Sequence, residues 1–410
     1  MFRGGLTMFR SISDSEKILI DKKFLSRCKS IELVINEKCQ NACTYCYRKY
    51  KHDKSSVFSL DPSIVRTHLE RFFDLIREDG KEFLKNRGIE LFGGDPLLDY
   101  KQSKEILKIV DEYKPKNITI PTNARLVSEL TEYDLEALFD GLDTRVGLSL
   151  SIDGDPSDNN RPLSKIGKML MYDEKVKYKK LFKIAKDRGY GYHPMLSFKQ
   201  IHKWLDTVQF FFNEFGVVPY LLEIRHSLSK ENMIEAVIQL AKIRNFLEEI
   251  HKDTIKSANT IKASRVPRGL GCSALTTISI FPNGDMPFCH RVIDPPWVYG
   301  NVNYGIDITK AISLTSVYDH RNIPDCIICP IREICSGQCQ GACYEYWGDP
   351  WIPIPSVCDY FRLKAYIFSL VYEDWETMVR QSFTNKNELK NSVLECFEKE
   401  TINHILDEIK

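Results

Sequence analysis

Ser-Ile-Glu-Leu-Val-Ile-Asn, residues 30–36, is the stretch that decides the fold. It is short, apolar and rich in β-branched residues, which favours a buried β-strand. Similar stretches recur as far as residue 226, and longer segments with helical periodicity separate them. Strands that alternate with helices in this way predict a parallel sheet built from βα units. The six strand candidates are Ser30–Asn36, Gly88–Phe92, Asn117–Thr122, Arg145–Ser151, Tyr192–Phe198 and Val218–His226.

Six such units predict an α/β fold with a partial (β/α)6 barrel, similar to a TIM barrel but open at one side. We assign residues 30–252 to this barrel and residues 1–29 to an N-terminal extension. A polar linker at 253–269 leads to a cysteine-rich domain at 270–360 and a helical C-terminal tail at 361–410. The cysteine-rich domain has too many Pro, Gly and Cys residues for a large apolar core, so we expect bound metal to hold it together.

The composition excludes several classes of function. The chain has 410 residues, and its 57 basic and 56 acidic residues nearly cancel, which argues against a general attraction to nucleic acid or an anionic membrane. We find no apolar segment of the ~20 residues that a membrane helix needs, and no secretory signal. We therefore expect a cytoplasmic protein. Its 13 cysteines would not stay paired in a reducing compartment, so metal or redox chemistry is the leading explanation for them.

The first cysteine motif is Cys39-Gln-Asn-Ala-Cys43-Thr-Tyr-Cys46, on the loop that follows the first strand. Three thiolates hold three irons of a four-iron cluster and leave the fourth iron open to an external ligand. The alternatives are a zinc site with one ligand missing, or three buried thiols without a metal. The spacing, with Tyr45 before the last cysteine, resembles the radical S-adenosylmethionine (SAM) superfamily. The resemblance implies a [4Fe-4S] cluster on these cysteines and SAM on the open iron.

The loops after the next strands agree with this resemblance. Gly93-Gly94-Asp95-Pro96 resembles the family's GGEP element, which receives the amino group of SAM, with Asp95 in place of Glu. Thr122-Asn123-Ala124 resembles its TNG turn, and Ser151-Ile152-Asp153-Gly154 with Arg161 resembles its SxDG segment. The SAM-binding residues that the resemblance implies are Tyr45, Gly93, Gly94, Asp95, Pro96, Thr122, Asn123, Ser151, Asp153, Arg161 and Leu196.

Plain structural roles explain some of these residues as well. A lone Gly-Gly-x-Pro is compatible with a tight turn, and Asp153 with an ordinary turn aspartate. Met195 and Leu196, on the fifth strand, form either an apolar shelf for adenine or part of the core.

The second cysteine motif fills the C-terminal third of the chain. The spacing of seven of its cysteines resembles that of the SPASM domain, the auxiliary-cluster module of radical enzymes that mature peptides and proteins. These cysteines are Cys272, Cys289, Cys326, Cys329, Cys335, Cys339 and Cys358. A pair of zinc ribbons is the alternative. The resemblance implies an outer [4Fe-4S] cluster on Cys326, Cys329, Cys335 and Cys358, and an inner one on Cys272, Cys289 and Cys339. Either Cys343 completes the inner cluster, or one of its irons stays open.

His290 directly follows Cys289, at a position where formylglycine-forming relatives carry an aspartate proposed as a base. A histidine serves as a base near neutral pH, so His290 is our candidate catalytic residue. A turn residue without catalytic role is the alternative.

Together these patterns predict a radical SAM/SPASM maturase of a ribosomally made peptide. Cleavage of SAM would give a 5′-deoxyadenosyl radical, and the peptide would gain an oxidative crosslink through a thioether, C–C or C–O bond. The partners would be the precursor peptide and an electron donor such as flavodoxin or ferredoxin. Residues 1–29 are too few for a leader-binding domain, so we expect leader recognition either elsewhere in the chain or in a separate leader-binding protein.

Other functions remain open at this point. If the chain is an enzyme, the alternatives are sulfatase maturation, peptide epimerisation and small-molecule dehydrogenation. If it is not an enzyme, it is either an iron–sulfur electron-transfer protein or a zinc-dependent nucleic-acid binder, and the neutral charge argues against the second.

Overall fold

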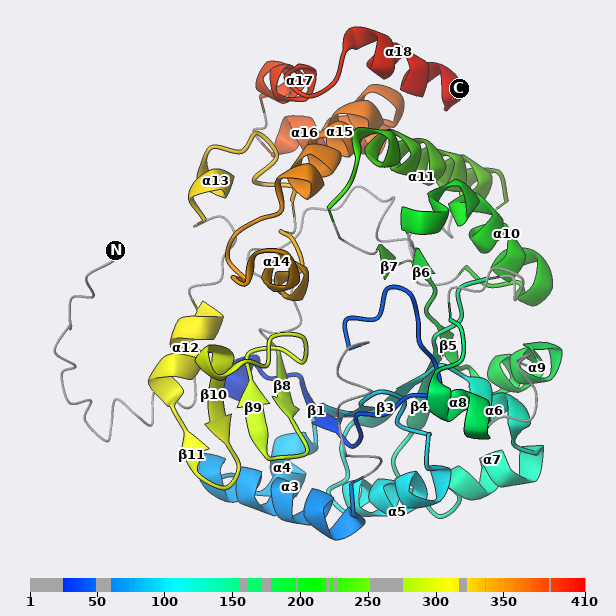
Figure 1. Cartoon of the computed structure of the whole chain (residues 1–410), viewed down its shortest axis with the longest axis vertical. Coiled ribbons are helices and arrows are strands. Elements are labelled where there is room, and N and C mark those ends of the chain that lie inside the picture. The colour runs from blue at the N-terminus through cyan, green and yellow to red at the C-terminus, as the bar shows by residue number, and fades with distance from the viewer. Residues whose placement is uncertain are drawn as a thin grey trace, which may run out of the picture.

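The computed structural model describes most of the chain, namely residues 25–48, 60–154, 161–170, 178–196, 198–218, 222–223, 227–250, 276–316, 323–335, 337–382 and 385–409. Figure 1 shows the sheet with its helices at one end of the molecule and the C-terminal helices at the other.

The main sheet has six strands in the order β5-β4-β3-β2-β1-β8, and every pair of neighbours is parallel. The predicted α/β fold with a six-stranded parallel sheet is therefore confirmed. The strands are β1 (Ser30–Val34), β2 (Gly88–Phe92), β3 (Asn117–Thr122), β4 (Val146–Leu150), β5 (Gly191–Tyr192) and β8 (Thr277–Ile280).

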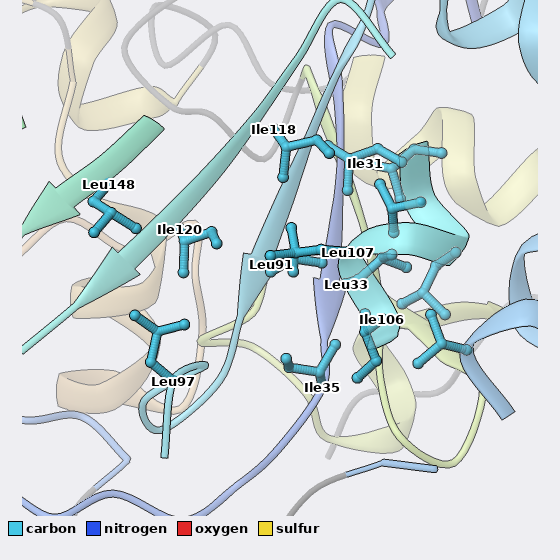
Figure 2. Close-up of a cluster of buried hydrophobic side chains, with 14 of the residues drawn as sticks. Ile31, Leu33, Ile35, Leu91, Leu97, Ile106, Leu107, Ile118, Ile120 and Leu148 are labelled. Carbon is cyan, nitrogen blue, oxygen red and sulfur yellow. The ribbon is translucent and has the colours of Figure 1, made fainter. Parts of the chain in front are cut away.

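Helices cover the outer face of this sheet (Figure 1). Figure 2 shows side chains of β1 to β4, such as Ile31 and Leu91, packed with Ile106 and Leu107 of α5, and all four are almost completely buried. Because side chains alternate along a strand, the residues between them point to the opposite face, which we call the inner face. The helices of this layer are α3 (Pro62–Ile76), α4 (Gly80–Leu84), α5 (Tyr100–Asp111), α6 (Arg125–Glu129), α7 (Glu132–Phe139), α8 (Lys165–Leu170) and α9 (Tyr178–Arg188).

The prediction of the last two strands was wrong in detail. The segment predicted as one strand at Tyr192–Phe198 forms two short strands, β5 and β6 (Met195–Leu196), with Pro194 between them. Proline has no N–H to donate to a neighbouring strand, so it interrupts the ladder. β7 (Leu222–Glu223) pairs with β6 in a separate two-stranded sheet, and β8 occupies the sixth place in the main sheet.

The C-terminal half contains a small antiparallel sheet and a helical region with its own apolar core. The helical C-terminal region is confirmed, although its first long helix, α15, begins at Pro355, before the predicted boundary at 361. Among the helices that the structure describes, none is long and apolar enough to cross a membrane. The remaining elements are β9 (Asp285–Pro287), β10 (Val298–Asn301), β11 (Gly305–Ile306), α10 (Trp204–Phe215), α11 (Lys230–Ile250), α12 (Ile308–Ser316), α13 (Pro324–Ile327), α14 (Gln340–Trp347), α15 (Pro355–Val371), α16 (Glu373–Gln381), α17 (Lys386–Leu394) and α18 (Lys399–Glu408), with 3₁₀ helices η1 (Phe198–Lys203) and η4 (Pro295–Trp297).

Candidate active site at the carboxyl ends of the strands

The loop after β1 carries Cys39, Cys43 and Cys46 close together. Cys39 and Cys43 are buried, while Cys46 is partly exposed. The backbone N–H of Asn41 donates to Cys39 Sγ at 3.3 Å, and the N–H of Cys46 donates to the Cys43 carbonyl at 3.1 Å. Burial raises the pKa of the Cys39 and Cys43 thiols, and the neighbouring cysteines add to this shift. Three thiols thus gather on one short loop.

Backbone hydrogen bonds fix this loop to the loops after β2 and β4. The Lys38 carbonyl accepts from Asp95 N at 3.0 Å, and the Gln40 carbonyl accepts from Ser164 N at 2.8 Å. Ala42 N donates to the Pro162 carbonyl at 2.7 Å. The cysteine loop is therefore positioned by the edge of the sheet where the carboxyl ends of the strands meet, the edge at which α/β proteins build their sites.

Gly93 and Gly94 allow the β2 loop to approach the cysteine loop closely. A Cβ on Gly94 would lie 2.0 Å from the Lys38 carbonyl oxygen, and one on Gly93 would lie 2.3 Å from Asn36 Oδ1. The Asn36 side chain accepts from Gly94 N at 2.9 Å and donates to the Asp95 carbonyl. A side chain at either glycine would push these two loops apart.

The Asp95 carboxylate joins the loops after β2 and β3. It is only 1% exposed, and it accepts hydrogen bonds from Leu97 N at 2.9 Å and Asn123 N at 2.8 Å. The Thr122 hydroxyl donates to it as well, 3.0 Å from Oδ2. Burial raises the pKa of Asp95 to about 6, although these hydrogen bonds oppose the shift. Pro96 continues the turn, and its carbonyl accepts from the Ser103 hydroxyl.

Asn123 connects the β3 loop with the cysteines. Its Nδ2 lies 3.4 Å from Cys39 Sγ and donates to Gln40 Oε1 at 3.0 Å. The next residue, Ala124, has a φ of 66°, in the left-handed region that glycine adopts most easily. The turn thus keeps a glycine-like conformation without a glycine.

Tyr45, Asp153 and Arg161 form a charged group beside the cysteines. Arg161 Nη2 donates to Asp153 Oδ1 at 2.8 Å, and the Tyr45 hydroxyl donates to the other oxygen of that carboxylate. Arg161 Nη1 lies 3.9 Å from Cys43 Sγ. Burial disfavours the charge on Arg161, but Asp153 more than compensates, so its pKa lies above the usual value. The guanidinium is therefore always charged next to the thiols.

The other residues predicted for this site lie near this group. The backbone N–H of Met195 donates to Asp153 Oδ1 at 3.0 Å, which places Leu196, the next residue of β6, close by. Ser151 N donates to the Thr122 carbonyl at 2.8 Å. All eleven residues predicted to bind SAM thus belong to the loops and strand ends around Cys39, Cys43 and Cys46.

A second group of thiols lines a cavity of about 650 Å³ next to α13 and α15. Five cysteines line it: Cys343 and the four that we predicted for the outer cluster, Cys326, Cys329, Cys335 and Cys358. Burial and the neighbouring thiols raise the pKa of Cys326 and Cys358 to about 12. Within the described ranges, no group of three or more His, Cys, Asp or Glu side chains is arranged to hold a metal ion.

The residues predicted for the inner cluster are only partly described. Cys272 lies outside the described residues. Cys289 is buried, and Cys339 precedes α14, where Arg291 Nη1 donates to its Sγ at 3.4 Å. Cys343 is buried, lines the cavity of the outer cysteines and donates to Gln338 Oε1 at 3.6 Å.

His290, the predicted base, lies on the inner face of the sheet. Its ring stacks on Phe92 with 4.7 Å between centroids, and its Nδ1 is 2.9 Å from Glu32 Oε2. Sequence reasoning missed Glu32 and its neighbour Glu90 in β2. The signal was present, because both strands contain Ile-Glu-Leu, and a charged residue inside a buried parallel strand is unusual. Asn36, whose side chain accepts a hydrogen bond from Gly94 N, was also missed, because nothing unusual in the sequence marks it.

Comparisons with known proteins identify the domain. Residues 33–196 match the family model described as Radical SAM superfamily. The chain is 24% identical over 394 residues to "Radical SAM cyclopropyl synthase TigE" from Paramaledivibacter caminithermalis, covering 88% of this chain and 78% of that relative. It is 32% identical over 98 residues to "Putative peptide biosynthesis protein YydG" from Bacillus subtilis, covering 23% of this chain and 26% of that relative.

Solved structures share the fold. The structure described as native anSMEcpe with bound AdoMet and Cp18Cys peptide has a TM-score of 0.62 at 12% identity, with 86% of this chain and 99% of that chain covered. This likeness concerns the architecture, and the sequence match to the family model concerns the segment with the cysteine loop. The chain carries a radical SAM domain at residues 33–196, the segment that contains the cysteine loop, and it is an enzyme.

Proposed function

We propose that this chain is a peptide maturase that uses SAM to install an oxidative crosslink in a ribosomally synthesised peptide. The observation that carries the proposal is the combination of a three-thiol loop inside a radical SAM domain with a cavity in the C-terminal half that five cysteines line. A single cluster suffices to cleave SAM, so further clusters imply an oxidation that needs another electron acceptor.

Cys39, Cys43 and Cys46 would hold the [4Fe-4S] cluster to which SAM binds. Their fit rests on the gathering of three cysteines, two of them buried, on one anchored loop, with backbone and Asn123 donors directed at Cys39 Sγ. When bound, the cluster and SAM supply a 5′-deoxyadenosyl radical that removes a hydrogen atom from an unactivated carbon.

The loop residues would bind and orient SAM. Gly93 and Gly94 bring the β2 backbone close to the thiols, and Arg161, paired with Asp153, places a fixed positive charge beside Cys43. Asp95 has no exposed oxygen left, so its part is to position the backbone around Thr122 and Asn123 rather than to contact the cofactor. The proposed SAM-binding residues also include Tyr45, Pro96, Ser151 and Leu196.

Cys326, Cys329, Cys335 and Cys358 would hold an outer auxiliary cluster in the 650 Å³ cavity, and Cys272, Cys289 and Cys339 an inner one. Gln338 would help to hold the outer cluster, because its Nε2 donates a hydrogen bond to Cys358 Sγ at 3.0 Å. Reduction requires an external donor such as flavodoxin or ferredoxin.

The names of the relatives favour a peptide substrate and a new C–C bond. One is described as a cyclopropyl synthase and the other as a putative peptide biosynthesis protein. Closing a ring between two carbons removes two hydrogens, which is the outcome of an oxidative crosslink.

Mass spectrometry of the precursor peptide tests this proposal. After co-expression with the enzyme, we expect the peptide to be lighter by about two mass units, because a crosslink removes two hydrogens and adds no atom. A thioether, C–C or C–O bond gives the same mass, and fragmentation then locates it. An unchanged mass with altered stereochemistry would instead assign an epimerase.

The auxiliary clusters give a further prediction. The reconstituted enzyme should hold about 12 irons, three clusters of about four.

Cys343→Ala should leave the spectrum of the inner cluster nearly unchanged, because the Cys343 thiol donates a hydrogen bond to Gln338 and lies beside the outer cysteines. Cys358→Ala, the control, should lose the outer cluster's signal. Loss of the inner signal in Cys343→Ala would assign Cys343 as its ligand.

A further inference from the structure

A row of polar side chains crosses the inner face of the parallel sheet. Ser279 of β8, Glu32 of β1, Glu90 of β2 and Thr119 of β3 are register partners in successive strand pairs. Register partners in a parallel sheet point to the same side, and Ile31, Leu33, Ile89 and Leu91 occupy the outer side. Parallel sheets usually bury apolar residues on both faces, so this row needs an explanation beyond folding.

Glu32 in this row is fully engaged. It is 3% exposed, and its oxygens accept from the Ser279 hydroxyl at 3.0 Å and from His290 Nδ1 at 2.9 Å. Both carboxyl oxygens of Glu32 and the nearer ring nitrogen of His290 are therefore occupied by these contacts. Stacking on Phe92 fixes the imidazole ring further. Glu32 and His290 therefore form a rigid pair over β1 and β2.

Glu90 differs from Glu32, although the two are direct neighbours in the sheet. It has no hydrogen bond or ion pair to any residue that the structure describes, and its side chain keeps some exposure. Burial raises the pKa of Glu90 to about 7, the charge of Glu32 adds to this shift, and His290 opposes it. Near neutral pH this carboxyl group both accepts and releases a proton easily.

A buried hydroxyl without a partner lies at the same place. Tyr47 Oη is completely buried and has no hydrogen-bond partner among the described residues. Its ring centroid is 5.5 Å from that of His290, and the charges of Glu32 and Arg291 both act on it. Buried polar atoms are nearly always paired in folded proteins, so this hydroxyl indicates that a polar group of a ligand completes the site.

We propose that Glu90 is the catalytic residue that takes up the proton which the peptide releases in the two-hydrogen oxidation, and that Glu32 and His290 position it. This inference rests on the proposed function. One hydrogen leaves the peptide as an atom to the 5′-deoxyadenosyl radical, and the other leaves as a proton to the Glu90 carboxylate. The remaining electron would go to an iron–sulfur cluster that the C-terminal cysteines would hold, and the two atoms that lost hydrogen would share the new bond.

The test compares Glu90→Gln with the wild-type holoenzyme, supplied with SAM, a reductant and the precursor peptide. The amide keeps the shape of the side chain but accepts no proton at this pH. We expect 5′-deoxyadenosine to form still, while the crosslinked peptide falls by on the order of 10²-fold, as for loss of a general base. In D₂O, the stalled peptide should recover a hydrogen and take up deuterium.

The control is Glu105→Gln, which removes the same charge from the exposed surface of α5 and should behave like the wild type. Infrared titration of the cluster-free protein gives a readout independent of turnover: a carboxyl band that titrates near pH 7 should be absent from Glu90→Gln. Thermal unfolding checks that the variant folds, and Glu90→Asp, with its carboxylate kept, should restore part of the product.

The outcomes separate the two proposals. If the wild type makes 5′-deoxyadenosine but no lighter peptide, the proposed function fails. If the wild type makes the crosslink and Glu90→Gln makes it equally well, Glu90 is not the proton acceptor. Parallel loss of peptide binding and 5′-deoxyadenosine would show instead that Glu90 binds a cationic group of the peptide, which also overturns this inference.

Discussion

The triple variant Cys39→Ala, Cys43→Ala, Cys46→Ala should produce no detectable 5′-deoxyadenosine, while it keeps about 8 of the 12 irons expected for three clusters. The three cysteines lie on one loop after β1, and the other proposed ligands lie beyond residue 270, so the two kinds of site should be separable. Chromatography of the nucleoside products and iron analysis of the same sample measure both effects.

Cys396→Ala is the control, because Cys396 is none of the proposed cluster ligands. It should retain wild-type cleavage of SAM and wild-type iron content. Persistent 5′-deoxyadenosine in the triple variant would remove these cysteines from the site. Circular dichroism should show an unchanged fold in both variants, since the small alanine side chain fits where a thiol was buried.

Gly94→Ala should lower SAM cleavage by about 10²-fold, although no chemical group of the site is lost. Its Cβ would lie 2.0 Å from the Lys38 carbonyl oxygen, which is backbone and cannot rotate away. The loops must separate, and the cysteines after Lys38 then move relative to the residues that orient SAM. The same clash should cost about 1–3 kcal/mol of stability, which thermal unfolding measures.

Gly191→Ala provides the comparison within the same sheet. No atom lies within 4 Å of a Cβ at Gly191, so this variant should stay within about 0.5 kcal/mol of the wild type. If Gly94→Ala cleaved SAM at the wild-type rate, the close approach of the two loops would not be needed for activity.

The sequence predicted the strands that carry the candidate site better than those at the edge of the sheet. β2 and β3 have the predicted bounds, because each is a short stretch with apolar residues at every second position that ends in turn residues. The prediction of the sixth strand was wrong, since β7, the described strand within 218–226, pairs with β6, and β8 takes the sixth place in the main sheet. Pairing between β1 and β8 depends on contacts across more than 240 residues, which local periodicity does not encode.

The residues of the candidate site likewise divide into those that the sequence predicts and those that only the folded chain shows. The cysteines and the loop motifs were visible because their residue types and spacing are unusual. The role of Asp95 was not, because only the folded chain shows that Leu97, Thr122 and Asn123 already occupy its carboxylate. Glu90 was overlooked for a similar reason: a single glutamate becomes significant only when the register brings it beside Glu32.

The pairing of β1 with β8 also determines the order of events during synthesis of the chain. Ser30 and Thr277, whose hydroxyls are 3.1 Å apart, are separated by 247 residues. At ribosomal rates of about 5–20 residues per second, β1 waits roughly 12–50 s for its second neighbour. Until then one edge of the strand has free N–H and C=O groups that pair readily with other chains. During this interval the free edge of β1 is a site where the growing chain is open to association with other chains, until the segment with β8 emerges.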